Sequence, residues 1–544
     1  MQHNHLNRLL ALSITALAIP LLSGCDIYNL FNRSDNSLSP SSSLHVNDFE
    51  GYYQTTGSSP CTFHDIGKLN ESPYLPSKGN VKVLVVPVEF SDYPFSSETL
   101  DDIASLTSGS AESTKYWESL SSFYSKSSYG ALNLSFVQTD VLNVGTISNF
   151  VKNAETKGGV SEYDSAPEYA MAEAVRKYKS TNGNTSTKEL DSDNDGYIDA
   201  TIMIYSAPDM NNNDALERYG NLFWAYCYAP TQEVDHPNYS PVGYRYFWAS
   251  YDFFYTGTTN AFGRHTGVDA HTLIHETGHL LGADDYYNMN AQGGETNEPS
   301  GALMMMCYNV GDHDMFTKLC YDWVHPYCPT GDCTISIKPS QENGDCIVLA
   351  DSWNGTGFDE YLLIDYVTPT GLNKLDAETV YPEYVGHLTE TSFKKPGIRV
   401  FHIDNRLVYG IGYDSNGVFQ AQGLVSDKDI QNFSSYNPVV TYQGQKAYGF
   451  AVPGVSNCAI YDCSLFQKKG FELISMIQRG GRYTWSEGGA ATSADLFQQG
   501  DTFTMEKYKA FFPNKTLNNG KSLGFSFTID SLTSDQAVIS FKKA

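Results

Sequence analysis

Apolar residues in the first part of the chain follow strand and helix spacings in turn. The β-branched run at 81–90 predicts a buried strand, despite Pro87 inside it. Four side chains then recur at helical spacing and predict an amphipathic helix: Tyr116, Leu120, Phe123 and Tyr124. Further strands are predicted at 131–137 and 200–205, with a helix at 166–178 between them. This alternation up to about residue 330 indicates an α/β or α+β domain.

The pattern changes beyond Cys333. Short runs at 361–366, 398–403 and 525–529 alternate or stay apolar, separated by Gly, Asn, Asp and Pro, which is typical of β-sandwich or β-barrel modules. A chain of 544 residues fits two or three domains, because single cores rarely exceed about 250–300 residues. We therefore expect an α+β protein, with a mixed-sheet domain over 79–332 and a sandwich-like region of one or two modules over 333–544.

The N-terminus predicts export. Arg8 precedes an apolar run at 9–22 that is too short for a standard spanning helix. The run ends in Leu-Ser-Gly-Cys25, which resembles a bacterial lipoprotein signal, so residues 1–24 would be removed and Cys25 acylated. A plain secretory peptide is the alternative. Residues 25–78 then form a polar tether with room for a short pro-segment. We expect an extracytoplasmic protein, lipid-anchored to a bacterial membrane at the cell surface or in the periplasm.

Charge and cysteine content narrow the possible functions of the protein further. With 35 basic and 62 acidic residues, the net charge is -27, which argues against nucleic-acid binding. Of ten cysteines, nine remain after Cys25, and in an exported chain disulfides are more common than thiolate metal sites. Two close pairs could each bridge a small loop: Cys328 with Cys333, and Cys458 with Cys463. Since nine is odd, one thiol is left over, and we expect it to be Cys307, buried.

The strongest motif is LIHETGHLLGADD at 273–285. On a helix, His275 and His279 share a face and can bind one zinc ion. Gly282 would let the chain leave the helix through a left-handed turn, so that Asp285 returns as the third ligand. Zinc held in this way keeps a position for water, and Glu276 is placed to act as the general base. A core helix with a histidine pair is the alternative.

Three other residues compete for the ligand set. His271 lies one turn before His275, but a fourth protein ligand would close the site, so we interpret it as a supporting or core residue. Asp284 is one residue out of register with the motif. Glu298 lies nineteen residues after His279, at a distance that suits a different ligand arrangement, but its Gly- and Asn-containing surroundings indicate a loop instead of the required helix.

A second segment, GALMMMCYN at 301–309, follows the zinc motif. Metzincin peptidases carry a methionine turn beneath the metal, and some have a Tyr two residues after that Met. Met306 and Tyr308 have this spacing, which predicts Met306 as the structural residue under the zinc. Tyr308 would ligate the metal or hydrogen-bond the oxyanion. A buried structural Tyr is the alternative.

An acidic loop, DSDNDGYID at 191–199, predicts calcium binding. Asp191, Asp193, Asp195 and Asp199 occupy positions 1, 3, 5 and 9 of a calcium loop, with Gly at position 6. Ile202 stands where such loops carry a bidentate Glu, so one ligand would come from elsewhere. A solvated acidic turn is the alternative.

Together these segments resemble the immune inhibitor A-like family of bacterial metallopeptidases over about residues 80–430. The matching segments are LVVPVEFSD at 84–92, SFYSKSSYG at 122–130, the acidic loop, the zinc motif, YNVGDHD at 308–314 and KPGIRV at 395–400. The resemblance implies a metzincin-like zinc domain, structural calcium and proteolysis outside the cell.

We therefore expect a zinc endopeptidase that cleaves extracellular proteins or peptides through a zinc-bound water activated by Glu276. It would act as a monomer tethered to the membrane by its lipid. Cys61, just before the first strand, could cap the zinc in a latent form, although a disulfide is the alternative. A different class, a catalytically silent surface adhesin on the same fold, would have no need of Glu276.

Overall fold

The computed structural model of the chain describes most residues from 74 onward. The described ranges are 47–49, 51–54, 74–110, 118–156, 166–181, 187–209, 219–229, 241–255, 267–288, 298–352, 357–379, 392–413, 419–425, 441–442, 445–446, 450–451, 454–455, 457–459, 472–485 and 490–544. The predicted signal peptide, Cys25, Cys61, Tyr116 and Cys463 lie outside these residues.

The first part of the chain forms a six-stranded sheet. Its strands are β3 (Gly79–Glu89), β4 (Leu132–Gln138), β5 (Leu142–Asn143), β6 (Thr201–Tyr205), β7 (Tyr226–Tyr228) and β8 (Tyr246–Ser250). The order is β4-β3-β6-β8-β7, and β5 also pairs with β3. The neighbouring strands from β4 to β8 run parallel, whereas β7 is antiparallel to β8 and forms one edge.

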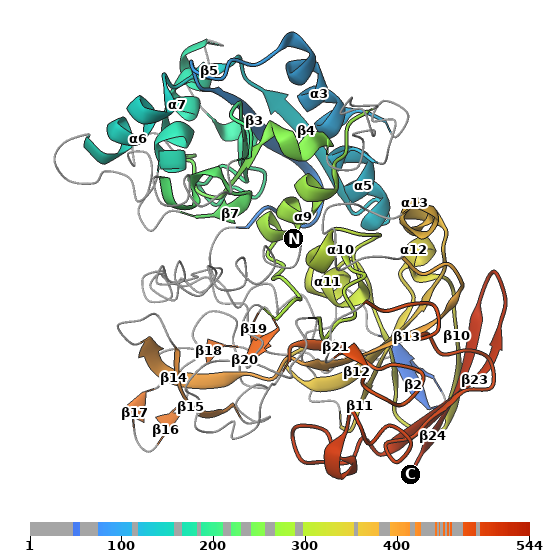
Figure 1. Ribbon diagram of the computed structural model, residues 1–544. Coiled ribbons are helices and arrows are strands. Elements are labelled where there is room, and N and C mark those ends of the chain that lie inside the picture. Colours follow the sequence, from blue (N-terminus) through green and yellow to red (C-terminus); the bar gives the residue numbers. More distant parts are fainter. Residues whose placement is uncertain are drawn as a thin grey trace, which may run out of the picture.

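Helices cover both faces of this sheet (Figure 1). They are α3 (Ser97–Ser108), α5 (Leu120–Ser127), α6 (Ile147–Thr156), α7 (Ala166–Thr181) and α9 (His271–Leu280). Successive strand residues point to opposite faces, so Val83 and Val85 join a core with α3, α5 and α9. Leu84 and Val86 join the other core, with α6 and α7. Burial on both faces explains the nearly continuous apolar run of β3.

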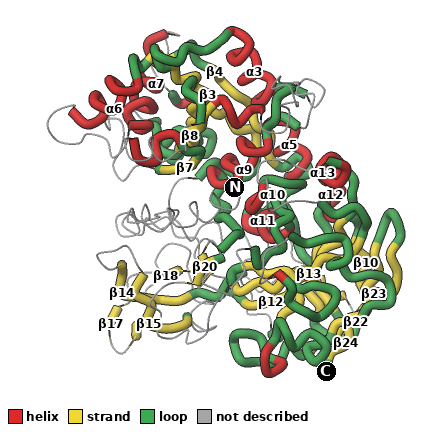
Figure 2. Tube along the Cα trace, in the orientation of Figure 1, coloured by secondary structure: helices red, strands yellow, loops and turns green. Residues whose placement is uncertain are grey.

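Among the regular elements of the C-terminal region, strands predominate (Figure 2). A seven-stranded sheet has the order β1-β2-β9-β11-β12-β13-β21, and a four-stranded sheet has the order β10-β24-β23-β22. A third core is shared by residues of both sheets, including Ile347 and Leu362 from the first and Phe527 and Ile539 from the second. The bounds are β1 (Asn47–Phe49), β2 (Tyr52–Gln54), β9 (Tyr327–Pro329), β10 (Cys333–Ile337), β11 (Cys346–Ala350), β12 (Glu360–Val367), β13 (Gly397–Asp404), β21 (Ile474–Met476), β22 (Thr502–Phe503), β23 (Phe525–Leu532) and β24 (Ala537–Lys543).

Smaller elements complete the described part of the chain. Short helices are α10 (Met305–Tyr308), α11 (Met315–Cys320), α12 (Ser340–Asn343) and α13 (Lys374–Glu378). A three-stranded sheet contains β14 (Val408–Tyr413), β15 (Phe419–Leu424) and β18 (Phe450–Ala451). Two strand pairs are β16 (Thr441–Tyr442) with β17 (Gln445–Lys446), and β19 (Gly454–Val455) with β20 (Cys458–Ala459).

The α+β class and the elements predicted from periodicity are confirmed. The predicted strands at 81–90, 131–137, 200–205, 361–366, 398–403 and 525–529 are β3, β4, β6, β12, β13 and β23. The predicted helix at 166–178 is α7, and the described part of the other is α5. A capping box starts α5: Ser122 donates its backbone N–H to the Ser119 hydroxyl at 3.2 Å, and the Ser119 N–H donates back to the Ser122 hydroxyl at 3.0 Å.

Two segments are placed differently from the expectation. Within the predicted tether, 47–49 and 52–54 form β1 and β2, and β2 pairs with β9 in the C-terminal sheet. In Figure 1 the blue strand β2 accordingly lies among the yellow and red strands. The strand β9 lies before the expected boundary at 333, yet it belongs to the C-terminal sheet because it pairs with β11. None of the helices in the described ranges combines the length and apolar composition that a membrane span requires.

Candidate metal centre

The helix α9 carries the zinc motif and is almost wholly buried. It ends as the sequence predicted, because Gly282 adopts φ +103°, a left-handed conformation that favours glycine. The backbone N–H of Ala283 donates to the Gly278 carbonyl at 3.1 Å, which turns the chain back toward the helix. This turn places Asp285 beside the two histidines.

Three ligand atoms converge at the C-terminal half of α9. The Asp285 Oδ1 atom lies 3.1 Å from His275 Nε2 and 3.2 Å from His279 Nε2. The two Nε2 atoms are 3.1 Å apart. Ligands about 2.0–2.1 Å from a tetrahedral zinc ion would be about 3.3 Å from one another. The observed triangle is therefore close to one face of a zinc tetrahedron.

Backbone carbonyls orient both imidazoles. His275 Nδ1 lies 2.8 Å from the Met305 carbonyl, and His279 Nδ1 lies 2.8 Å from the Ala283 carbonyl. A carbonyl can only accept, so each Nδ1 carries a proton, and each ring in its neutral form presents the Nε2 lone pair. Two lone pairs and a carboxylate oxygen thus face one point, which is the arrangement that second-shell partners impose on metal ligands.

The three groups also influence one another electrostatically. Burial alone would raise the pKa of Asp285, but His279 and His275 lower it below the usual range of a carboxyl group. Burial would lower the pKa of His279, yet the Asp285 carboxylate raises it to about 10. The Asp285 Oδ1 atom is buried and accepts no hydrogen bond, while Oδ2 accepts one from Tyr287 at 2.9 Å. The two nitrogens and one oxygen fit a divalent metal ion.

Glu276 is buried next to the ligands on the same helix. Its Oε2 atom has no hydrogen-bond partner and is out of contact with solvent, so one carboxylate oxygen is unused within the protein. The Cys227 thiol on the edge strand β7 donates to the Glu276 backbone carbonyl at 2.9 Å. This contact fixes the strand against the helix that carries the predicted base.

Met306 packs directly against α9. A Cβ atom at Gly278 would lie only 2.5 Å from Met306 Sδ, and 3.2 Å from His313 Cε1. A side chain at this position would therefore force Met306 to shift. The structural role of Met306 beneath a metal stays a prediction, and the neighbouring Met305 carbonyl lies 2.8 Å from His275 Nδ1.

The competing ligands are held elsewhere. The Glu298 carboxylate accepts hydrogen bonds from the Tyr308 hydroxyl and, at 3.0 Å, from the Cys307 thiol. Burial raises the pKa of Glu298 to about 7. Asp284 also lies outside the cluster of ligand atoms formed by the described residues, and burial raises its pKa to about 6. Since Tyr308 is paired with Glu298 in this geometry, its catalytic role stays a prediction.

His271 lies outside the cluster of ligand atoms formed by the described residues. It is fully buried, with Nδ1 2.5 Å from Asp269 Oδ1 and Nε2 3.2 Å from Asp376 Oδ1. Burial would lower its pKa, but these two carboxylates raise it to about 10. The sequence pattern gave no signal for Asp376, which lies 105 residues away in α13.

The acidic loop gathers three of its four predicted ligands. Carboxylate oxygens of Asp191, Asp193 and Asp195 lie within 4.8 Å of one another. The Asp199 carboxylate stays outside this group, because it accepts the Ser192 backbone N–H at 3.1 Å. Burial raises the pKa of Asp199 to about 7. Asp199 therefore closes the loop in this geometry, and its role as a calcium ligand stays a prediction.

The cysteines in the described residues give a mixed outcome. Cys307 is buried with a free thiol, but it is not the single one expected, because five other described cysteines are also free: Cys227, Cys320, Cys328, Cys333 and Cys346. The Cys333 thiol is also free, so the bridge to Cys328 is not formed. The partner of Cys458 lies outside the described residues.

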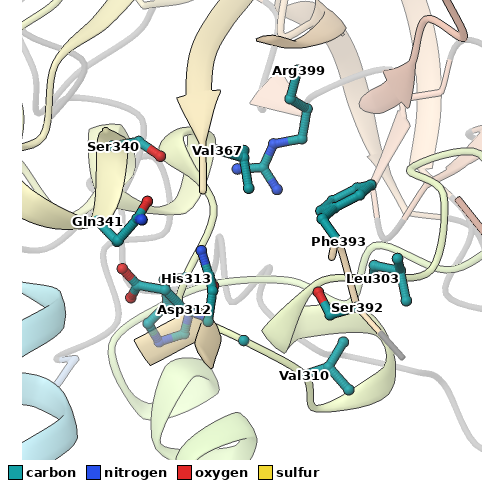
Figure 3. Close-up of a pocket in the computed structure, with 12 residues that line it drawn as sticks. Leu303, Val310, Asp312, His313, Ser340, Gln341, Val367, Ser392, Phe393 and Arg399 are labelled. Carbon is teal, nitrogen blue, oxygen red and sulfur yellow. The ribbon is translucent and has the colours of Figure 1, made fainter. Parts of the chain in front are cut away.

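A separate small cavity of about 10 Å³ lies between the methionine segment and the C-terminal region (Figure 3). Val310, Asp312 and His313 line one side, and Val367 and Arg399 line the other. None of the ligand atoms of the candidate metal centre belongs to its lining among the described residues, so we do not assign chemistry to it. The cavity does mark where the two regions meet.

A scan against models of protein families gives no match to this sequence, and a search of curated proteins gives none either.

Proposed function

We propose that this protein is a zinc endopeptidase with His275, His279 and Asp285 as the metal ligands. The observation that carries the proposal is the triangle of two Nε2 atoms and one carboxylate oxygen, 3.1–3.2 Å apart, with both Nδ1 atoms committed to carbonyls. Such a site offers three protein ligands and leaves room for a fourth, which is the pattern of catalytic and not of structural zinc. Zinc bound there would polarise a peptide carbonyl and lower the pKa of a water to about 7.

Glu276 would supply the acid–base step. Its unpaired Oε2 atom is free to accept a proton from the attacking water and to return it to the departing amine. Burial beside the ligands excludes bulk solvent and strengthens these interactions. The intact base also favours an enzyme over a silent adhesin, because a binding protein needs no unpaired buried carboxylate at this position.

The fold and the setting complete the proposal. We assign the six-stranded sheet with α9 to a metzincin-like peptidase domain, on the basis of the antiparallel edge strand β7 and of Met306 under the helix. The paired C-terminal sheets are assigned as a sandwich on the basis of their shared core. The sequence resemblance to the immune inhibitor A-like family, the lipoprotein signal and the acidic loop support an extracytoplasmic, lipid-anchored, calcium-stabilised enzyme.

Casein hydrolysis by the wild type and by Glu276→Gln tests this function. We expect chelator-sensitive hydrolysis by the wild type that returns on adding zinc, and a loss of about 10²–10⁴-fold in Glu276→Gln with zinc retained. Equal hydrolysis by both proteins would exclude Glu276 as the base. Zinc in both with hydrolysis by neither would favour the adhesin.

A further inference from the structure

The N-terminal turn of the zinc helix is fixed by a residue of the C-terminal region. Asp376 in α13 lies 3.2 and 3.3 Å from His271 Nε2 through its two carboxylate oxygens. On the other side of the ring, Asp269 Oδ1 contacts His271 Nδ1 at 2.5 Å and accepts the His271 backbone N–H at 3.0 Å. The side chains of all three residues are at most 1% exposed.

The same carboxylate also reaches the segment beneath the metal. Asp376 Oδ2 accepts the backbone N–H of Gly311 at 2.7 Å. Gly311 follows the methionine segment, whose Met305 carbonyl orients His275. One carboxylate from the C-terminal region therefore joins the zinc helix to the segment that supports its first ligand.

The third ligand has a similar support. Asn457, which is fully buried, donates from Nδ2 to the carbonyl of Tyr286 at 2.5 Å. Its Oδ1 accepts the backbone N–H of Ile474, the first residue of β21, at 2.8 Å. Because Tyr286 follows Asp285 directly, this amide ties the third ligand to the large C-terminal sheet.

We propose that the C-terminal region is part of the metal centre itself, with Asp376 as a positioning residue that sets the zinc helix through His271. This inference rests on the proposed zinc function. His271 and His275 are four residues apart on one helical face, so holding the first fixes the rotation of the second. Metal sites require ligand positions within about 0.2 Å, so a small rotation of α9 weakens binding.

A packing role alone does not account for this arrangement. An apolar side chain at 271 would fill the same space without burying an imidazole between two carboxylates, and desolvating such groups is unfavourable. Charged groups in a fixed geometry instead define one orientation, which is what a metal centre needs.

The zinc affinity of the full chain tests whether Asp376 positions the metal ligands. The apo forms of the wild type and Asp376→Asn would be titrated with zinc against a chromophoric chelator at constant pH. We expect Asp376→Asn to bind zinc about 10-fold or more weakly, in line with the effect of losing outer partners of metal ligands. If that variant does not fold, Asp376→Glu moves the carboxylate by one methylene, and we expect it to weaken zinc binding as well.

Asp365→Asn is the matched control. Asp365 is an equally buried aspartate of the C-terminal region, but its partner is Arg399, through hydrogen bonds of 2.9 and 3.0 Å. We expect this variant to lose stability and keep wild-type zinc affinity. Wild-type affinity in Asp376→Asn, or an equal loss in both variants, would overturn the positioning role. Failure of the wild type to bind zinc would instead overturn the proposed function.

Discussion

Glu298 shows how a single residue's role depends on its surroundings. Its position in the sequence, nineteen residues after His279, made Glu298 a competing ligand. In the structure its carboxylate instead contacts Cys307 and Tyr308. The turn at Gly282, which the glycine predicted correctly, brings Asp285 beside the histidines. The partners of Glu298 could not be predicted, because they depend on how the loop at 298–308 folds back.

The raised pKa of Glu298 predicts a pH dependence of stability. Its folded-state pKa is about 7, against 4.5 for the unfolded chain. The folded state therefore holds the proton more tightly, and this contribution to stability is complete below pH 4.5 and lost as pH rises through 7. Between pH 4.5 and 7.5, the wild type should lose about 1–3 kcal/mol of unfolding free energy relative to Glu298→Gln. Urea denaturation of both proteins at the two pH values measures this difference, and parallel curves would contradict it.

At the scale of elements, the packing of α9 against the methionine segment depends on one close contact. A Cβ at Gly278 would meet Met306 Sδ at 2.5 Å, so Gly278→Ala should destabilise the fold by about 1–3 kcal/mol through overpacking. Gly480→Ala is the control, because its Cβ would meet nothing within 4 Å. Chemical denaturation compares the two variants. Equal stability of both would show that Met306 moves aside without cost.

Calcium binding to the acidic loop at 191–199 should stabilise the folded protein. In zinc-saturated protein, calcium should raise the melting temperature by a few degrees, because it binds the folded loop and not the unfolded chain. Asp193→Asn should reduce this shift, whereas Asp140→Asn, an exposed aspartate outside the loop, should not. Differential scanning calorimetry with and without calcium gives the result. A shift that survives in Asp193→Asn would place the calcium elsewhere.

Elements were the best-predicted level of this protein. β3, β6 and α7 could be located from periodicity because each has a regular apolar pattern. The helix α9 could be located because His275 and His279 are close in sequence. The segments β1 and β2 could not, because three-residue strands have too little pattern and exist through pairing with β9.

The whole molecule has a core that crosses the expected domain boundary. The core beneath α9 also contains Phe401 and Met476 from the C-terminal sheet, together with Trp485. Contacts such as Asp376 with His271 join residues more than a hundred positions apart, so no local pattern could predict them. We expect both regions to unfold in one calorimetric transition, and two well-separated transitions would contradict a shared core.

X-ray absorption at the zinc edge of the purified full chain tests the central claim most directly. The account predicts one zinc per chain, with nitrogen and oxygen ligands at about 2.0–2.2 Å, and loss of the metal in Asp285→Ala but not in Asp284→Ala. A sulfur ligand at about 2.3 Å would show that cysteines bind the metal. That result, or a chain without zinc, would contradict the assignment of His275, His279 and Asp285 as a catalytic centre.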